Sequence, residues 1–400
     1  MRNGVALAAL PPLALYVHIP WCVRKCPYCD FNSHELRNGQ ADPAASSART
    51  IGADLEARYV QALTADLEHA LPLIWGRRVH AVFFGGGTPS LLSVHALDQI
   101  LSMIRARLPL SANAEITLEA NPGTFEVEKF RQFRALGVNR LSIGIQSLNP
   151  RHLEALGRIH GEREALRAVE IAHVHFDNFN LDLMYALPAQ TLAEAVEDIQ
   201  RAIDLAPPHL SAYHLTIEPN TYFHRYPPKV PDDELSASMQ EVIEQRLADA
   251  GYAHYETSAF ARPGHECQHN LNYWRFGDYV GIGAGAHGKL SLPNRIFRQM
   301  RWKNPREYMD KALAGEPVQT EQEIGIAELP FEFMMNALRL TGGVPLRSLE
   351  ERTGLPLGTV LEPLERAEAL GLIERDHEKL APTLRGQRFL NELLQLFLPG

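Results

Sequence analysis

Six short strand-like runs between residues 14 and 218 limit the folds open to this chain, because segments with helical periodicity separate them. The runs are ALYVHIP (14–20), HAVFFGGG (80–87), EITLEAN (115–121), RLSIGIQS (140–147), NFNLDLMY (178–185) and HLSAYHLTIE (209–218). Several are almost continuously apolar, as parallel strands covered on both faces should be. The alternation predicts an α/β fold with a parallel sheet, either open or barrel-like.

Polar or glycine-rich residues close nearly every predicted strand. They are Cys22, Gly85–Gly87, Glu119, Gln146, Asp182 and Glu218. Barrels and open α/β sheets place their chemistry at the carboxyl ends of their strands. The pattern therefore predicts one active face, at that edge of the sheet.

The predicted organisation has four parts: an N-terminal tail (1–13), a barrel (14–230), a barrel-completing or linking region (231–324) and a C-terminal domain (325–400). The C-terminal part is leucine-rich and mostly helical, and its segment 349–386 resembles a small winged-helix module. Residues 37–53, RNGQADPAASSARTIGA, are small and polar, and we interpret them as a mobile loop insertion.

Composition and net charge limit the cellular compartment and the kinds of binding partner that we expect. A formal net charge of −9 argues against a general nucleic-acid surface, so we expect the winged-helix-like domain to pack or to bind a protein. Four cysteines in 400 residues make no disulfide framework, and a reducing cytoplasm is the natural setting. Pro11 and Pro12 interrupt the apolar N-terminus, which we interpret as a tail and a first strand. No apolar run reaches the about 18 residues of a spanning helix, and peripheral membrane contact stays open.

Three of the four cysteines lie within eight positions, in the stretch HIPWCVRKCPYCDFNSH (18–34). Cys22, Cys26 and Cys29 form a C-x3-C-x2-C run that suits two kinds of metal site. A structural zinc ion takes four ligands. Candidates for its fourth ligand are His18, His34 and Cys267. A [4Fe–4S] cluster normally takes four thiolates, so three would leave one iron open for an exogenous ligand.

The cysteine run after the first strand and GGGTPS (85–90) after the second resemble the radical S-adenosylmethionine (SAM) superfamily. The resemblance implies a partial (β/α)6 barrel that holds a [4Fe–4S] cluster on Cys22, Cys26 and Cys29, with SAM chelating the open iron. The positions implied to contact SAM are Tyr16, Tyr28, Gly86, Gly87, Thr88, Glu119, Gln146, Arg158 and Asp182. Taken singly, each also has a structural alternative, such as a tight turn, a helix cap, a core position or a surface ion pair.

The later segment HNLNYW (269–274) matches the H-N-x-x-Y-W motif of HemW-type proteins. The resemblance implies that this motif takes part in haem binding. His269 would then be an axial haem ligand, because a neutral imidazole binds haem iron well. In the structural alternative, this segment ties a loop to the barrel. Competing ligands nearby are His265, Cys267 and His287. The G-x-G-x-x-A match at 281–286 lacks the helix that a dinucleotide site needs.

Within the superfamily, the chain is most similar to a subgroup of oxygen-independent coproporphyrinogen III oxidases and HemW-type haem chaperones. The oxidases carry a fourth cysteine where this chain has Phe31, and a longer extension than the 21 residues before Cys22. The resemblance therefore implies a cytoplasmic haem chaperone that delivers haem to respiratory haem proteins, membrane-bound ones included. The alternatives are a SAM-dependent oxidative decarboxylase of coproporphyrinogen III and a purely structural iron–sulfur or zinc protein. Catalytic residues, haem recipients and oligomeric state stay unassigned.

Overall fold

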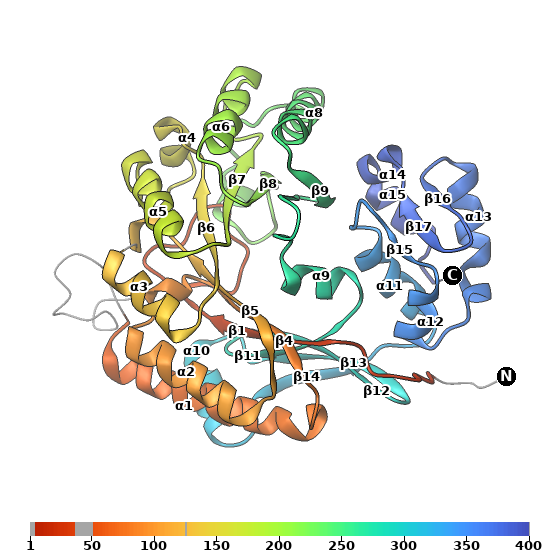
Figure 1. Ribbon diagram of the computed structural model, residues 1–400, viewed down its shortest axis with the longest axis horizontal. Coiled ribbons are helices and arrows are strands. Elements are labelled where there is room, and N and C mark those ends of the chain that lie inside the picture. Colours follow the sequence, from red (N-terminus) through yellow and green to blue (C-terminus); the bar gives the residue numbers. More distant parts are fainter. Residues whose placement is uncertain (1–4, 37–50, 125, 400) are drawn as a thin grey trace.

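A twelve-stranded mixed sheet organises the larger part of the chain, and a computed structural model describes residues 5–36, 51–124 and 126–399 (Figure 1). Its strands lie in the order β14-β13-β12-β11-β1-β4-β5-β6-β7-β8-β10-β9. The predicted strands are confirmed as β1 (Leu13–Ile19), β4 (Val79–Gly86), β5 (Leu110–Ala120), β6 (Arg140–Gln146), β7 (Phe179–Tyr185) and β8 (His209–His214). They are parallel and adjacent in chain order, as a partial (β/α)6 barrel requires.

The sheet extends beyond the predicted strands on both sides. On one side β11 (Asp278–Ile282) pairs in parallel with β1 and is followed by the antiparallel strands β12 (His287–Leu292), β13 (Arg295–Arg301) and β14 (Val318–Glu323). On the other side β10 (Ala259–Ala261) and β9 (Ala253–Glu256) continue from β8. In the part of the chain that the structure describes, the outer strands β14 and β9 do not pair with each other, so the sheet is open.

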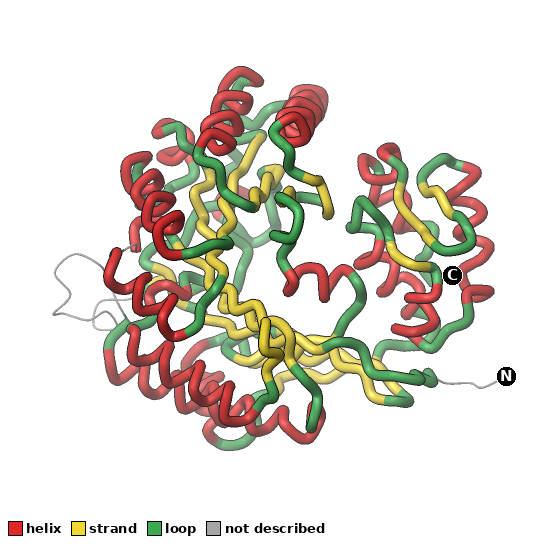
Figure 2. Tube along the Cα trace, viewed as in Figure 1, coloured by secondary structure: helices red, strands yellow, loops and turns green. Residues whose placement is uncertain are grey.

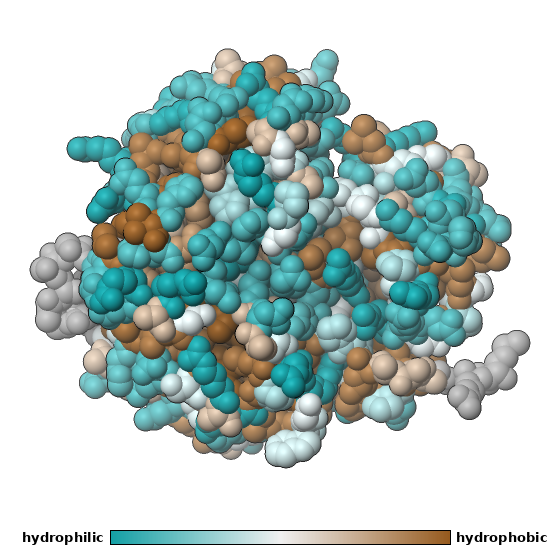
Figure 3. Space-filling model, in the orientation of Figure 1, coloured by the Kyte–Doolittle hydropathy of each residue, from teal (hydrophilic) through white to brown (hydrophobic). Residues whose placement is uncertain are grey.

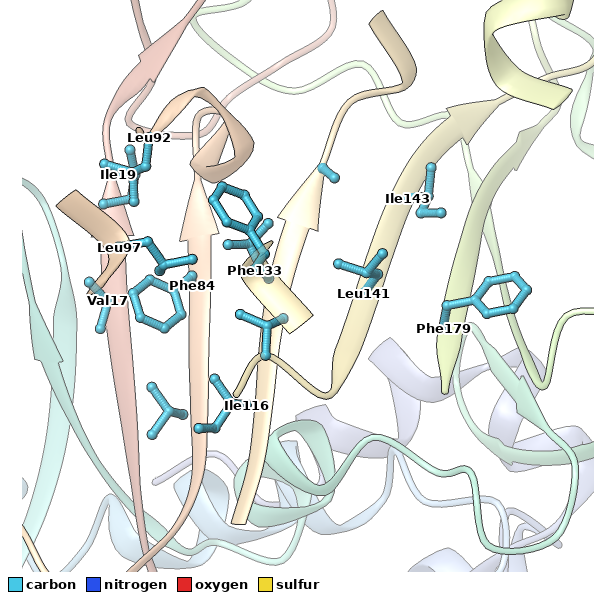
Figure 4. Packing of buried hydrophobic residues seen from close by; sticks show 14 of the residues in the cluster. Val17, Ile19, Phe84, Leu92, Leu97, Ile116, Phe133, Leu141, Ile143 and Phe179 are labelled. Carbon is cyan, nitrogen blue, oxygen red and sulfur yellow. The ribbon is translucent and has the colours of Figure 1, made fainter. Parts of the chain in front are cut away.

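Helices cover the apolar outer face of the sheet, and one short helix lies on its inner face. Alternate residues such as Val17, Phe84 and Leu141 point to the outer face, where Leu97 and Phe133 pack against the sheet (Figure 4). The helices of the barrel are α1 (Ala53–Ile74), α2 (Val94–Arg107), α3 (Val127–Leu136), α4 (Pro150–Ala155), α5 (Glu162–His175), α6 (Leu192–Asp204), α7 (Tyr222–Arg225), α8 (Asp233–Asp249), α9 (Gln268–Trp274) and α10 (Pro305–Leu313). Helix α9 lies against β1, β4 and β11 on the inner face (Figure 1).

The C-terminal domain is mostly helical and contains a separate three-stranded sheet (Figure 2). Its elements are α11 (Leu329–Ala337), β15 (Val344–Pro345), α12 (Arg347–Thr353), α13 (Leu361–Ala369), β16 (Ile373–Arg375), β17 (Lys379–Pro382), α14 (Leu384–Arg388) and α15 (Leu390–Gln395). Arg388 pairs with Glu244 of α8 at 2.9 Å, and Thr341 Oγ1 donates to the carbonyl of His254 at 2.6 Å. These contacts join the domain to the barrel.

The N-terminal segment before β1 also contacts the C-terminal domain. Val5 is buried in the same apolar cluster as Phe333 and Leu364. Leu7 N–H donates instead to Pro293 O, in the turn between β12 and β13, at 3.0 Å. Most of the predicted mobile insertion, residues 37–50, lies outside the described residues; Ile51 is buried and α1 begins at Ala53.

The surface offers no broad apolar band on the face shown in Figure 3, where hydrophilic residues predominate and apolar ones are scattered. None of the helices that the structure describes combines the length and the apolar character that crossing a bilayer demands.

A buried ion pair fastens α1 to the antiparallel extension of the sheet. Asp66 accepts a hydrogen bond from Arg301 Nε at 2.9 Å, from Tyr308 Oη at 2.9 Å and from Gly283 N–H at 3.1 Å. The two charged side chains are 0% and 1% exposed. Because neither charge reaches water, each depends on the other for its stabilisation.

We predict that Asp66→Ala lowers the free energy of unfolding by about 3–5 kcal/mol, because the Arg301 guanidinium stays buried without its partner. The control is Asp310→Ala, which removes an exposed pair with Arg58 and should cost less than about 1 kcal/mol. Urea unfolding followed by tryptophan fluorescence measures both variants. Equal losses in the two would contradict the prediction.

Candidate cofactor site

The cysteine loop follows β1 directly and leaves the sheet at its carboxyl edge. Cys22 ends the short strand β2 (Trp21–Cys22), which pairs in parallel with β3 (His34–Glu35), so the two ends of the loop lie side by side. Cys22, Cys26 and Cys29 are free and half-buried. Burial raises the pKa of the Cys22 thiol to about 11, and the charges of Cys29 and Cys26 add to the shift. Metal binding requires deprotonated thiolates, so a bound metal ion would have to overcome this shift.

Each cysteine sulfur has a polar neighbour from a different segment. Thr88 Oγ1 donates to Cys22 Sγ at 3.6 Å, and Arg158 Nη1 donates to Cys26 Sγ at 3.4 Å. Cys29 Sγ lies 3.5 Å from Ser33 Oγ. Hydrogen bonds of this kind orient thiolate ligands and tune the metal that they hold.

The candidates for a fourth zinc ligand are engaged elsewhere. The His18 ring nitrogens lie 3.0 Å from Tyr16 Oη and 2.9 Å from the Asn32 carbonyl. His34 Nε2 lies 3.3 Å from Asn32 Oδ1, and Cys267 Sγ donates to Glu115 Oε1 at 3.6 Å. Within the described ranges, no three His, Cys, Asp or Glu side chains group around one metal-ion position, and this includes the three loop cysteines.

The glycine turn after β4 lies directly beneath the cysteine loop. Gly87 N–H donates to the Ile19 carbonyl at 2.7 Å, and Thr88 N–H donates to the Trp21 carbonyl at 2.8 Å. A Cβ on Gly87 would lie 2.5 Å from Trp21 O, and one on Gly86, whose φ is 114°, would lie 2.6 Å from the His18 ring. Glycine is therefore required here for the turn to contact the backbone that carries Cys22.

Two half-buried carboxyl groups lie on the inner face near this turn. Glu119 accepts from Gly86 N–H at 3.2 Å, and burial, together with the charge of Asp182, raises the Glu119 pKa to about 8. Asp182 accepts from Ser142 Oγ at 3.0 Å and from Asn180 Nδ2 at 2.7 Å, and burial raises its pKa as well. A buried carboxylate is costly without a cation or several donors. The amino and hydroxyl groups of a ligand such as SAM would supply those donors.

Arg158 is half-buried and links the cysteine loop to β6, and among the described residues it forms no ion pair of the kind considered from the sequence. Besides Cys26, it donates to the Gly144 carbonyl at 2.8 Å and to Tyr28 Oη at 3.5 Å. Its buried Nε has no hydrogen-bond partner among the described residues. Gln146, at the end of the same strand, has a φ of 70°, a left-handed conformation that is uncommon for a non-glycine residue.

His269 lies on the inner face, on α9, and is 3% exposed. Its ring stacks on Phe83 at a centroid distance of 4.9 Å, meets the edge of Tyr273 at 4.9 Å and lies 6.2 Å from Tyr16. Neither ring nitrogen has a hydrogen-bond partner in the described part of the chain. Burial, with smaller contributions from His80 and Arg140, lowers the His269 pKa to about 3, so the imidazole is neutral at physiological pH.

The sequence interpretation missed the polar residues beneath this histidine. Glu115 and Thr117 precede Glu119 on the inner face of β5, and Arg140 begins β6 beside them. The alternation E-x-T-x-E along β5 was the available signal, because residues two apart share a face of a strand. Asn272 was also missed; its Nδ2 donates to the Asp278 carbonyl at 2.8 Å and ties α9 to β11.

Comparison with known proteins gives two family matches and several relatives. The Radical SAM superfamily matches residues 16–202, and the HemN C-terminal domain matches residues 327–389. The protein named Heme chaperone HemW of Escherichia coli (strain K12) is 48% identical over 394 residues, which cover 98% of this chain and 100% of the relative. The protein of the same name from Bacillus subtilis (strain 168) is 33% identical over 391 residues, covering 96% of this chain and 98% of that protein.

A solved structure of coproporphyrinogen III oxidase (HemN) from Escherichia coli, described as a radical SAM enzyme, has a similar fold. The TM-score is 0.80, at 22% sequence identity, over 97% of this chain and 90% of that chain. At this identity the likeness concerns the fold alone.

The raised Glu119 pKa predicts a specific pH dependence of stability. Between the usual value of 4.5 and about 8, the folded protein keeps a proton that the unfolded chain has lost. The free energy of unfolding should therefore fall as pH rises through this window, by up to about 1.4 kcal/mol per pH unit. Glu119→Gln cannot ionise and should show a shallower slope in urea unfolding between pH 5 and 8.

The matched control is Glu128→Gln on the exposed surface of α3. Hydrogen bonds from Arg131 and Gln132 lower the Glu128 pKa to about 2, so this carboxylate stays ionised throughout the window. Its variant should keep the wild-type slope. A wild-type slope in Glu119→Gln would mean that Glu119 is already ionised at neutral pH.

Proposed function

We propose that this chain, which belongs to the HemW family of the radical SAM superfamily, binds haem and delivers it to respiratory haem proteins while carrying a SAM-binding [4Fe–4S] cluster. The observation that carries the proposal is the near-full-length identity to proteins named Heme chaperone HemW, 48% for the Escherichia coli protein and 33% for the Bacillus subtilis protein. The sequence-derived limits 1–13, 14–230, 231–324 and 325–400 are our proposed domain boundaries.

We assign the cluster to Cys22, Cys26 and Cys29, and SAM to the iron that these three thiolates leave open. The donor set supports this, because the three sulfur atoms share one loop and each has its own polar neighbour. When bound, the cluster would supply an electron to SAM. The residues proposed to hold SAM are Tyr16, Tyr28, Gly86, Gly87, Thr88, Glu119, Gln146, Arg158 and Asp182.

Their roles follow from the contacts described above. The turn at Gly86 and Gly87 brings backbone close to the cluster loop, and Thr88 reaches from it to Cys22. Glu119 offers carboxylate oxygens to hydrogen-bond donors of the ligand. Arg158 holds the loop to β6 and keeps its Nε–H available. Together these groups would orient SAM and exclude water from it.

We assign haem iron to His269, whose neutral imidazole has two nitrogen atoms without hydrogen bonds to described residues. Haem is then cargo, and the recipients are respiratory haem proteins, membrane-bound ones included. The cytoplasm is the proposed location, with no role for nucleic acid. His265, Cys267 and His287 remain the competing ligands.

The second candidate function is oxidative decarboxylation of coproporphyrinogen III, favoured by the match of residues 327–389 to the HemN C-terminal domain. Phe31 argues against it, because it stands where those oxidases carry a fourth cysteine; here it is 62% exposed on the loop. Anaerobic incubation of reconstituted protein with SAM and coproporphyrinogen III separates the two functions. Catalytic formation of protoporphyrinogen would overturn the chaperone assignment.

For the cluster, we expect anaerobically reconstituted protein to hold about four iron and four sulfide ions per chain. Cys26→Ser should lose most of both, because one of three ligands is gone. Cys267→Ser is the control: it alters the one cysteine outside the loop and should keep the iron. Wild-type protein with stoichiometric zinc and no iron would refute the cluster.

For haem, we expect His269→Ala to bind at least about tenfold more weakly than wild type and to show a changed Soret band, because the iron loses an axial ligand. His377→Ala is the control, since His377 is an exposed histidine of the C-terminal domain. If His269→Ala has the same spectrum and haem affinity as wild type, His269 is not the axial ligand, and one of the competing ligands must bind the iron.

A further inference from the structure

Three polar side chains on the inner face of the sheet are buried without hydrogen bonds to described residues. The unpartnered atoms are Thr117 Oγ1, Arg140 Nε and both ring nitrogens of His269. These residues are 0%, 2% and 3% exposed. Buried polar atoms are nearly always paired, so an unpaired group calls for a specific explanation, and a bound ligand is one.

The three residues form one patch. Thr117 on β5 is in register with Phe83 on β4 and with Arg140 on β6. The His269 ring stacks on that same Phe83, and the charge of Arg140 contributes to the low His269 pKa. The patch thus combines a hydroxyl, a guanidinium and a neutral imidazole on neighbouring strands and the helix that covers them.

The carboxyl groups around Arg140 accept hydrogen bonds from other residues. Glu115 Oε1 accepts from the backbone N–H groups of Gln268 and His269 at 3.0 and 3.3 Å, and so holds the N-terminus of α9. Its other oxygen lies 3.9 Å from Arg140 Nε, close enough for attraction but too far for a hydrogen bond. Asp182 is occupied by Ser142 and Asn180. The guanidinium therefore has a charge partner, while its buried Nε–H has no hydrogen-bond acceptor among the described residues.

Aromatic rings complete the surroundings of His269. Besides Phe83 and Tyr16, Tyr273 lies against it, and the Tyr273 ring is 4.1 Å from that of Tyr279. Aromatic rings stack on the faces of a planar macrocycle, and an imidazole coordinates its iron. A guanidinium forms charge-assisted hydrogen bonds with a carboxylate. A tetrapyrrole with propionate arms presents all three chemistries at once.

We infer that the patch is the inner end of the haem site, where Arg140 pairs with a propionate carboxylate of the haem whose iron binds His269, and Thr117 adds a hydrogen bond. This inference rests on the proposed function and extends it from one iron-binding histidine to three residues that contact the haem. Because the rings enclose His269, haem uptake requires α9 or these side chains to move.

The test compares haem with haem dimethyl ester, in which both propionates are neutral. Wild type should bind haem about tenfold or more tightly than the ester, because a charge-assisted pair is lost in the ester. Arg140→Gln should remove this preference by weakening haem binding and leaving ester binding unchanged. Arg140→Lys should keep part of it. Arg131→Gln, which removes an exposed guanidinium from α3, should behave as wild type.

The outcomes separate this inference from the proposed function. Wild type that binds neither haem nor ester would overturn the haem assignment itself. Wild type that binds both equally would overturn only the propionate contact, and so would an unchanged preference in Arg140→Gln. Loss of SAM affinity in Arg140→Gln and Arg140→Lys, with haem binding intact, would instead assign Arg140 to the carboxylate of SAM. The comparison of haem with its ester on wild-type protein needs no variant. It can therefore still contradict the inference if Arg140→Gln does not fold.

Discussion

The candidate site depends on one backbone contact, between the glycine turn after β4 and the segment that leads from β1 into the cysteine loop. Two N–H groups of the turn donate to carbonyls of that segment, at Ile19 and Trp21. The contact is short because Gly87 has no Cβ, and it brings Thr88 within reach of Cys22. Together with the β2–β3 pairing and the Arg158 bridge, this contact fixes where the cysteine loop leaves the sheet.

The inner face also separates two environments along the strands. At the carboxyl edge lie the cysteines, the glycine turn and two carboxyl groups of raised pKa. Deeper in the barrel, α9 places His269 among aromatic rings, with a guanidinium nearby. The first environment suits a ligand with amino and hydroxyl donors, and the second suits a flat ligand with an iron and carboxylates. One fold can therefore hold both groups on one surface.

The sequence predicted the parallel strands well because each is a local apolar run closed by a polar residue. It also predicted which strand ends share an edge, since that follows from parallel topology alone. It missed β11, because DYVGI is short and its pairing with β1 joins residues that are 265 positions apart. Arg140 and Glu115 escaped notice for a related reason: their importance depends on α9, which no nearby pattern brings to β5. Arg158 likewise could be placed beside Cys26 only by the folded chain.

The pairing of β1 with β11 has a consequence for how the chain is made. Residues 13–17 can complete their hydrogen bonds on that side only after residues 278–282 have been synthesised. At roughly 5–20 residues per second, the strand that leads into the cysteine loop remains an unpaired edge for tens of seconds. Exposed apolar edges invite wrong pairing, and β1 is almost entirely apolar. The strand that leads into the cysteine loop is therefore open to wrong pairing for longer than strands whose partners are close in sequence.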